Sequence, residues 1–263
     1  MIDRFPTKMN SLNHIKAFLN DEIATVIDVG ILISTKELMS VFSEKKHVLI
    51  EPLQEYYEVI NERYSQAGID FTLLELAASN NMGVQNLQKR NHLPNLGDRF
   101  GGVTASNLVF TEGAAHDPTN IVSVKTDTLD NIKSAFTGPF LVKIDVDGAE
   151  FEILEGLRDV DDVYLVVVEC WLSRIERFQS VMKEKGFNLY DITDLCYMRG
   201  QLSQVDLVFL NRKLFDNEAY PEISPRRFGH TPAVSGNYVP FNENVAEKNI
   251  DRFQAISERG QLE

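Results

Sequence analysis

Short apolar runs of strand length alternate with amphipathic segments of helical period along residues 23–210, and this alternation constrains the fold more than any other feature of the sequence. Strands that alternate with helices build mostly parallel sheets whose two faces are both covered. We therefore expect an α/β fold with a doubly wound sheet, closed by an antiparallel pair. The predicted strands are residues 25–30, 47–52, 71–78, 121–124, 140–145, 163–168, 187–192 and 205–210. The predicted helices are residues 34–42, 56–64, 128–132, 149–157 and 171–182.

Three local signals refine this prediction. Ser34 and Glu37 have the spacing of a capping box, which predicts the start of the first of these helices. Trp171 is predicted to begin the last one, with its ring on the apolar face of that helix. Residues 93–106 are rich in Gly and Pro and are expected to form a loop.

Two flanking segments differ from the alternating region. Residues 1–22 are predicted to form an N-terminal helical segment. Four of the nine prolines lie within residues 221–240, so residues 211–263 are expected to form an extended, proline-containing appendage without a core of its own. Assembly into a homo-oligomer through this C-terminal extension is one role that we consider for it.

The composition of the chain argues against two classes of partner, membranes and nucleic acids. Apolar residues make up 43% of the chain, enough for a folded core, while no apolar run approaches the ~20 residues that a membrane span needs. A formal net charge of -13 disfavours nucleic acid, because phosphate backbones are anionic. Only two cysteines occur, and no signal-peptide pattern opens the chain, so we expect a cytoplasmic protein with neither a membrane nor a nucleic-acid partner.

Acidic residues follow four of the predicted strands: Asp28, Glu51, Asp145 and Glu169. Ligands of open α/β sheets bind beyond the carboxyl ends of the strands, so these side chains are candidates for one site. Each of them alone could instead cap a turn or lie in solvent. Phosphate-binding glycine motifs and zinc-type Cys/His clusters are absent from the sequence. A cationic cofactor with a ribose, such as S-adenosylmethionine, suits an acidic edge better.

Several motifs occur in the order found in one methyltransferase family. They are Val26-Ile-Asp28-Val-Gly30, Leu49-Ile-Glu51-Pro52, Ala77-Ala78-Ser79-Asn80, Thr104-Ala-Ser-Asn-Leu108, Thr128-Leu-Asp130, Lys143-Ile-Asp145-Val-Asp147-Gly148-Ala-Glu150 with Ile153-Leu-Glu-Gly156, and Val168-Glu169. In these motifs the chain resembles the FkbM-type methyltransferases. The resemblance implies a class I methyltransferase fold, with a Rossmann-like sheet of seven mostly parallel strands. It also implies S-adenosylmethionine as methyl donor and O-methylation of a hydroxyl on a sugar, a glycan or a secondary metabolite.

The resemblance also implies roles for single residues. Asp28 and Gly30 would border the methionine end of the cofactor, and Glu51 would hold its ribose. The residues expected near the adenine are Ala78, Ser79 and Asn80. Asp145, Glu150 and Glu169 would surround the site of methyl transfer.

Chemistry at the acceptor needs a base, because a sugar hydroxyl is a weak nucleophile. Asp145 and Glu169 follow adjacent strands, and we assign the base role to this pair. Mg²⁺ prefers oxygen ligands, so a Mg²⁺ ion bound by Asp145, Asp147 and Glu169 is an alternative. Trp171 is a candidate for stacking on a sugar ring or for the core. His92 and His116 are alternative bases.

One loop departs from the family pattern. The family usually has glycine, alanine, asparagine, any residue and glycine after the first strand, whereas this chain has Gly30-Ile-Leu-Ile-Ser34. A serine at the last position adds a Cβ where the backbone approaches the cofactor. An alternative function therefore stays open: a non-catalytic, methyltransferase-like module for binding or assembly.

Overall fold

The protein was analysed as a computed structural model, which describes residues 7–19, 21–90, 105–108 and 120–215. The side chains of Arg90 and residues 105–108 are not part of the description. The chain divides into two units, residues 1–216 and 217–263, and the second lies outside the described residues. The predicted limits of the N-terminal segment and of the C-terminal extension therefore stay predictions.

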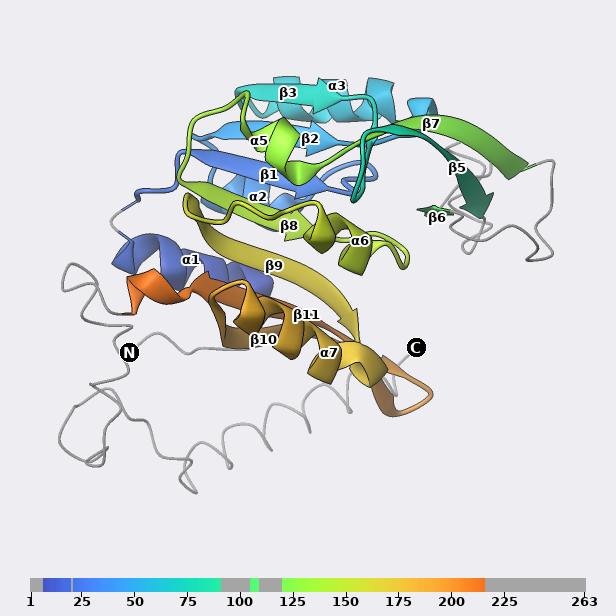
Figure 1. The fold of residues 1–263 in the computed structure, drawn as a ribbon. Helices are drawn as coiled ribbons and strands as arrows, with labels where there is room; N and C mark the ends of the chain where they lie inside the picture. The colour runs from blue at the N-terminus through green and yellow to red at the C-terminus, as the bar shows by residue number, and fades with distance from the viewer. Residues whose placement is uncertain (1–6, 20, 91–104, 109–119, 216–263) are drawn as a thin grey trace, which may run out of the picture. The chain divides into compact units, whose positions relative to one another are not determined.

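The central sheet has seven strands in the order β10-β11-β9-β8-β1-β2-β3 (Figure 1). Neighbours from β9 to β3 run parallel, whereas β11 is antiparallel to both β9 and β10. The strands are β1 (Thr25–Val29), β2 (Lys46–Ile50), β3 (Phe71–Leu74), β8 (Phe140–Ile144), β9 (Val163–Trp171), β10 (Phe187–Met198) and β11 (Gln201–Asn211). This arrangement confirms the predicted α/β fold of class I methyltransferase type.

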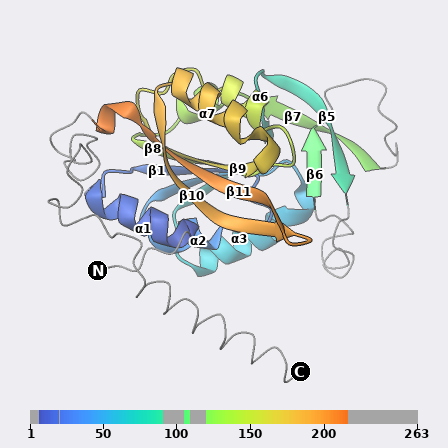
Figure 2. The ribbon, with the colours of Figure 1, turned by 90° about the horizontal axis from the view of Figure 1, so that it is seen from below.

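Helices cover both faces of this sheet, with α1, α2 and α3 on one side and α6 and α7 on the other (Figure 2). The α-helices are α1 (Lys8–Phe18), α2 (Lys36–Val41), α3 (Tyr57–Gln66), α5 (Leu129–Lys133), α6 (Glu150–Glu155) and α7 (Ile175–Glu184). Short 3₁₀ helices span Gln54–Tyr56, Leu172–Arg174 and Arg212–Leu214. Because both faces are covered, every residue of β1 and β8 is buried. No helix of the described residues is long and apolar enough to cross a membrane.

Two local predictions at helix starts were wrong. The first predicted helix begins at Lys36 after Thr35, and Ser34 does not cap it, because the Ser34 hydroxyl accepts a hydrogen bond from Arg63 Nη1 at 2.7 Å. Trp171 belongs to the end of β9 rather than to a helix, since the sequence alone does not show that the strand runs past Val168. The helix that follows, α7, starts only at Ile175.

A second sheet of four strands, in the order β4-β7-β5-β6, was not predicted. Its strands are β4 (Ala77–Ala78), β5 (Gly83–Arg90), β6 (Ala105–Leu108) and β7 (Ile121–Asp127). The predicted strand 71–78 is thus two strands, because the chain leaves the central sheet after Leu74 and pairs with β7 instead. The predicted loop 93–106 ends in β6, and residues 93–104 lie outside the described part.

Candidate functional site

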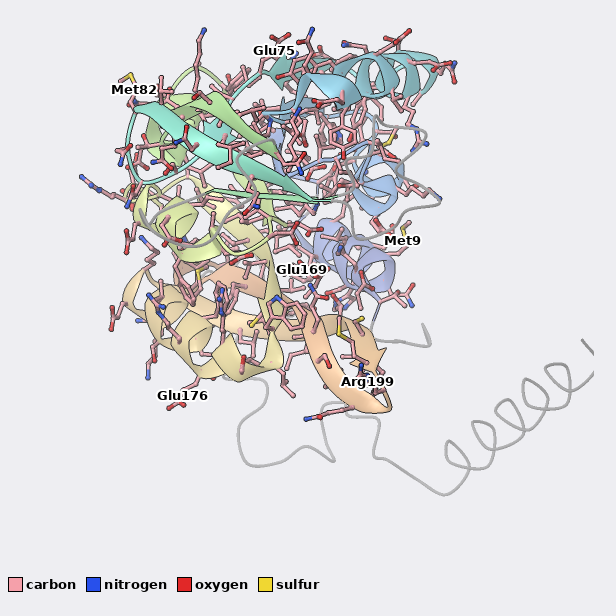
Figure 3. The ribbon with its side chains drawn as sticks, turned by 90° about the vertical axis from the view of Figure 1, so that its right-hand side faces the viewer. Met9, Glu75, Met82, Glu169, Glu176 and Arg199 are labelled. Carbon is pink, nitrogen blue, oxygen red and sulfur yellow. The ribbon has the colours of Figure 1, made fainter. Side chains whose placement is uncertain are left out.

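A cavity of about 500 Å³ lies at the carboxyl ends of β1, β2, β8 and β9. Figure 3 looks onto this edge of the sheet, where Glu169 is labelled. The second sheet contributes Ala77, Ala78 and Leu87 to the wall, and α1 contributes Lys8. The volume falls within the range of about 300–1,000 Å³ that is typical of ligand pockets. The cavity therefore has the position and the size expected for a ligand site of an open α/β sheet.

The loop after β1 is held by a glycine. Gly30 has a φ of +75°, and its N–H donates to the carbonyl of Ile50 at 3.1 Å. A Cβ built at Gly30 would lie 2.0 Å from the carbonyl oxygen of Asp145. Glycine is thus required because the chain leaving β8 crosses directly over it. Ile31 is buried and Leu32 has a φ of +55°, and both line the cavity.

Glu51 joins two loops at the end of β2. Its side chain is only 4% exposed, yet it lines the cavity. Glu51 Oε2 accepts from the N–H of Leu32 at 3.1 Å, and Oε1 accepts from the N–H of Leu53 at 3.0 Å. Burial raises the pKa of Glu51 to about 8, although these two hydrogen bonds act in the opposite direction. In the ionised form each carboxylate oxygen has a second lone pair, so both oxygens can still accept from a ligand hydroxyl.

The three residues predicted near an adenine differ in position. Ala78 lines the cavity. Ser79 is fully buried outside the lining, and its hydroxyl accepts from Gln85 Nε2 at 3.2 Å. Asn80 Nδ2 donates to Glu155 Oε2 at 3.0 Å, away from the cavity lining. Only Ala78 of the three is therefore placed for direct contact in this structure, and the roles of Ser79 and Asn80 stay predictions.

A buried lysine organises the carboxylates between β1 and β8. Lys143 Nζ lies 3.3 Å from Asp28 Oδ1 and 3.1 Å from Asp145 Oδ2, and it donates to Thr35 Oγ1 at 3.3 Å. Asp28 is 0% exposed and does not line the cavity, so in this structure it holds Lys143 rather than facing a ligand. Its predicted contact with a cofactor stays a prediction. Lys143 was not singled out, although a lone lysine within a strongly apolar strand is a detectable signal.

Asp145 and Glu169 converge at the ends of β8 and β9, and their side chains are hydrogen-bonded to each other. Burial, followed by the negative charge of Asp145, raises the pKa of Glu169 to about 8. Burial alone would raise the pKa of Asp145 too, but the charges of Lys143 and Lys8 outweigh it and hold that pKa below its usual range. Glu169 is thus the member of the pair that favours the protonated form, and Asp145 the member that favours the ionised form.

The other acidic residues near β8 have different surroundings. Asp147 is exposed and lines the cavity. Glu150 is buried outside the lining: Oε1 accepts from the N–H of Gly148 at 2.9 Å, and Oε2 lies 3.6 Å from Arg174 Nη1. Within the described residues, no three His, Cys, Asp or Glu side chains are grouped so that they could hold a metal ion. The alternative of a Mg²⁺ ion at Asp145, Asp147 and Glu169 stays a prediction.

Three further side chains border the carboxyl pair. Trp171 is 43% exposed and lines the cavity, and its partner in the β9–β11 register, Gln204, lines it as well. Lys8 reaches the same region from α1. Sequence reasoning missed Gln204 and Lys8, because nothing local shows that α1 and β11 meet at this edge. His92 and His116 lie outside the described residues.

A comparison with known protein families gives one match. The model of the methyltransferase FkbM domain matches residues 28–198. No curated protein matches the sequence significantly.

Three solved structures are distant matches. An rRNA methylase from Streptococcus thermophilus is 9% identical, with a TM-score of 0.44, over 80% of this chain and 98% of that one. Precorrin-6y C5,15-methyltransferase from Geobacter metallireducens is 10% identical, with a TM-score of 0.40, over 80% and 94%. Magnesium protoporphyrin IX methyltransferase from Synechocystis, solved with bound S-adenosylmethionine, is 9% identical, with a TM-score of 0.39, over 77% and 79%.

Proposed function

Because the chain belongs to the methyltransferase FkbM domain family, we propose that it transfers a methyl group from S-adenosylmethionine to a hydroxyl of a sugar, a glycan or a secondary metabolite. One observation carries this proposal: a single cavity holds an inward-facing acid at the end of β2 and a carboxyl pair at the ends of β8 and β9. The first suits a ribose, and the second suits removal of a proton from an acceptor.

The residues present fit such a cofactor. Glu51 would accept hydrogen bonds from the two ribose hydroxyls, as the family resemblance implies. Ala78, Leu87 and Tyr56 supply an apolar wall next to it, which suits an adenine ring. The backbone around Gly30 would border the methionine end. S-adenosylmethionine supplies a methyl group that its sulfonium already activates.

The chain's own work is then to hold the acceptor and take its proton. A bond forms between the acceptor oxygen and the methyl carbon as the bond from carbon to sulfur breaks, which leaves S-adenosylhomocysteine. Glu169 in its ionised form would take the hydroxyl proton, and Asp145 would orient Glu169 through their hydrogen bond. Trp171 and Gln204 would position the acceptor beside this pair. Holding the reacting atoms in line supplies much of the catalysis in such a displacement.

The test combines binding with turnover. Calorimetry should show one S-adenosylmethionine site per chain, and labelled methyl groups should be transferred to members of a panel of hydroxyl compounds. Glu169→Gln should lower turnover about 10²–10⁴-fold while cofactor binding is retained. Glu184→Gln, an exposed change on α7 outside the cavity lining, is the matched control. Near-wild-type turnover in both Asp145→Asn and Glu169→Gln would remove the pair from the chemistry.

No metal is needed in this proposal, and turnover should be unchanged in excess EDTA. Loss of turnover that Mg²⁺ restores would instead assign Asp145, Asp147 and Glu169 to a metal site.

A second candidate function rests on the loop after β1. Ile31 and Leu32 line the cavity at positions where the family has a small and a polar residue, and Leu32 holds a left-handed φ of +55°. Such a loop favours a non-catalytic module that no longer binds the cofactor. Absence of both heat and a thermal shift with S-adenosylmethionine would support this candidate. Deletion of residues 217–263, which leaves β11 and the following 3₁₀ helix in place, would show whether assembly depends on the C-terminal extension.

A further inference from the structure

Lys8 stands at the first position of α1, and its ammonium is fixed beside the carboxyl pair. The side chain is almost fully buried, with Nζ 2.5 Å from Asp206 Oδ2 on β11 and 3.4 Å from Asp194 Oδ2 on β10. The backbone N–H of Lys8 also donates to Asp194 Oδ1 at 3.0 Å. A lysine that was merely solvated would not be anchored at both its backbone and its side chain.

Asp206 connects this anchor to the carboxyl pair. It lies directly opposite Glu169 in the antiparallel register of β11 and β9, so the buried Asp206 and the partly exposed Glu169 face each other across the strands. Like charges on directly opposed residues repel each other. The negative charge of Asp206 therefore favours the protonated form of Glu169. Lys8 pairs with Asp206 and also acts on Asp145, where it favours the ionised form.

The charges that surround the pair come from six elements. They are Asp28 on β1, Lys143 on β8, Asp147 in the loop after β8, Asp194 on β10, Asp206 on β11 and Lys8 on α1. Lys143 is shared between Asp28 and Asp145. Lys8 is thus the second of two lysines that offset an excess of carboxyl groups, and the one that enters from outside the central strands.

The matched family segment ends before this ion pair is complete. It covers residues 28–198, whereas Lys8 precedes it and Asp206 follows it. The Lys8–Asp206 ion pair therefore lies outside the segment that the family model matches.

We propose that Lys8 is a positioning residue: the Lys8–Asp206 ion pair places a fixed positive charge beside Asp145 and Glu169, and so sets which of the two carries a proton and how readily Glu169 gives it up. The catalytic meaning of this proposal rests on the proposed methyl transfer. Its electrostatic content is a property of the free protein and can be measured without an acceptor.

The experiment is a carboxyl ¹³C NMR titration of the full chain labelled at Asp and Glu. Lys8→Met should raise the midpoint pH of the Glu169 titration by about one pH unit. This is the size of one charge–charge interaction over several ångströms at an effective dielectric constant of about 20. Asp206→Asn should move it downward. The double variant should return toward wild type, because it removes one charge of each sign. Lys8→Arg should also stay close to wild type, since the charge is kept.

Lys16→Met is the matched control. Lys16 also lies on α1, but it pairs with Asp21 and Glu44 away from the cavity, so no shift is expected. Removing one partner of a buried pair can prevent folding. If Lys8→Met alone does not fold, the difference between Asp206→Asn and the double variant measures the same contribution of Lys8.

The proposal is overturned if the midpoint pH of the Glu169 titration is unchanged or lower when Lys8 is replaced by Met. Calorimetry of the wild type with S-adenosylmethionine, run in parallel, separates the two levels. Cofactor binding with no effect of Lys8 refutes this inference alone, whereas absence of cofactor binding refutes the proposed methyl transfer and leaves the charge effect to be judged by the titration.

Discussion

Gly30→Ala should both destabilise the protein and distort the site, because two separate penalties act at this position. The first is the left-handed φ of +75°, which costs an alanine roughly 1–2 kcal/mol. The second is steric: the new Cβ would lie 2.0 Å from the carbonyl oxygen of Asp145 and 2.8 Å from Val146 Cγ1. The backbone after β8 must therefore retreat by about 1 Å, and overpacking of this kind costs about 1–3 kcal/mol.

The sum is a loss of about 2–5 kcal/mol in the free energy of unfolding, or about 4–20 °C in Tm for a domain of this size. Urea denaturation followed by circular dichroism measures it. Gly68→Ala is the control, since Gly68 has a φ of +67° but nothing within 4 Å of its Cβ position. That variant carries the backbone strain without the overlap and should lose no more than about 1–2 kcal/mol. Equal losses in the two variants would refute the argument that the β8 loop crosses over Gly30.

Three further predictions concern the cavity. Burial raises the pKa of Glu51 from 4.5 to about 8. The contribution of Glu51 to stability is therefore present below pH 4.5 and is lost as the pH rises through about 8. Urea denaturation from about pH 5 to about pH 9 should show a fall in the free energy of unfolding that Glu51→Gln lacks. Methyl transfer should speed up as the pH rises through about 8, where Glu169 loses its proton, and a flat rate profile across that range would contradict a base role. Trp171→Ala should raise the KM for the acceptor several-fold with Trp171→Phe close to wild type, and an unchanged KM would move Trp171 out of the acceptor site.

The central sheet could be predicted because its strands carry their own signal. Residues 163–168 are a continuous apolar run and residues 140–144 are apolar except for Lys143, a pattern typical of strands covered on both faces. The second sheet carried no comparable signal. Strand β5 is mostly polar, and the apolar run 71–78 gives no sign that the chain changes sheet after Leu74.

The site was predictable only in part for a related reason. Asp145 and Glu169 follow neighbouring parallel strands, so their convergence follows from topology. Glu51 reaches the cavity for the same reason. The position of Lys8 in the cavity could not be predicted. It depends on how α1 packs against β10 and β11, which are distant from α1 in the sequence. Trp171 was assigned to a helix because its spacing to Phe178 fits a helical period. The same residue fits the end of a strand equally well, and the structure places it at the end of β9.

A crystal structure of the full chain with S-adenosylhomocysteine soaked into the crystals tests most directly whether the cavity binds the cofactor. We expect the ribose hydroxyls on the Glu51 carboxyl group, the adenine against Ala78 and Leu87, and the sulfur directed toward Asp145 and Glu169. A nucleoside bound elsewhere, or a cavity that stays closed around Leu32 at saturating ligand, would contradict it.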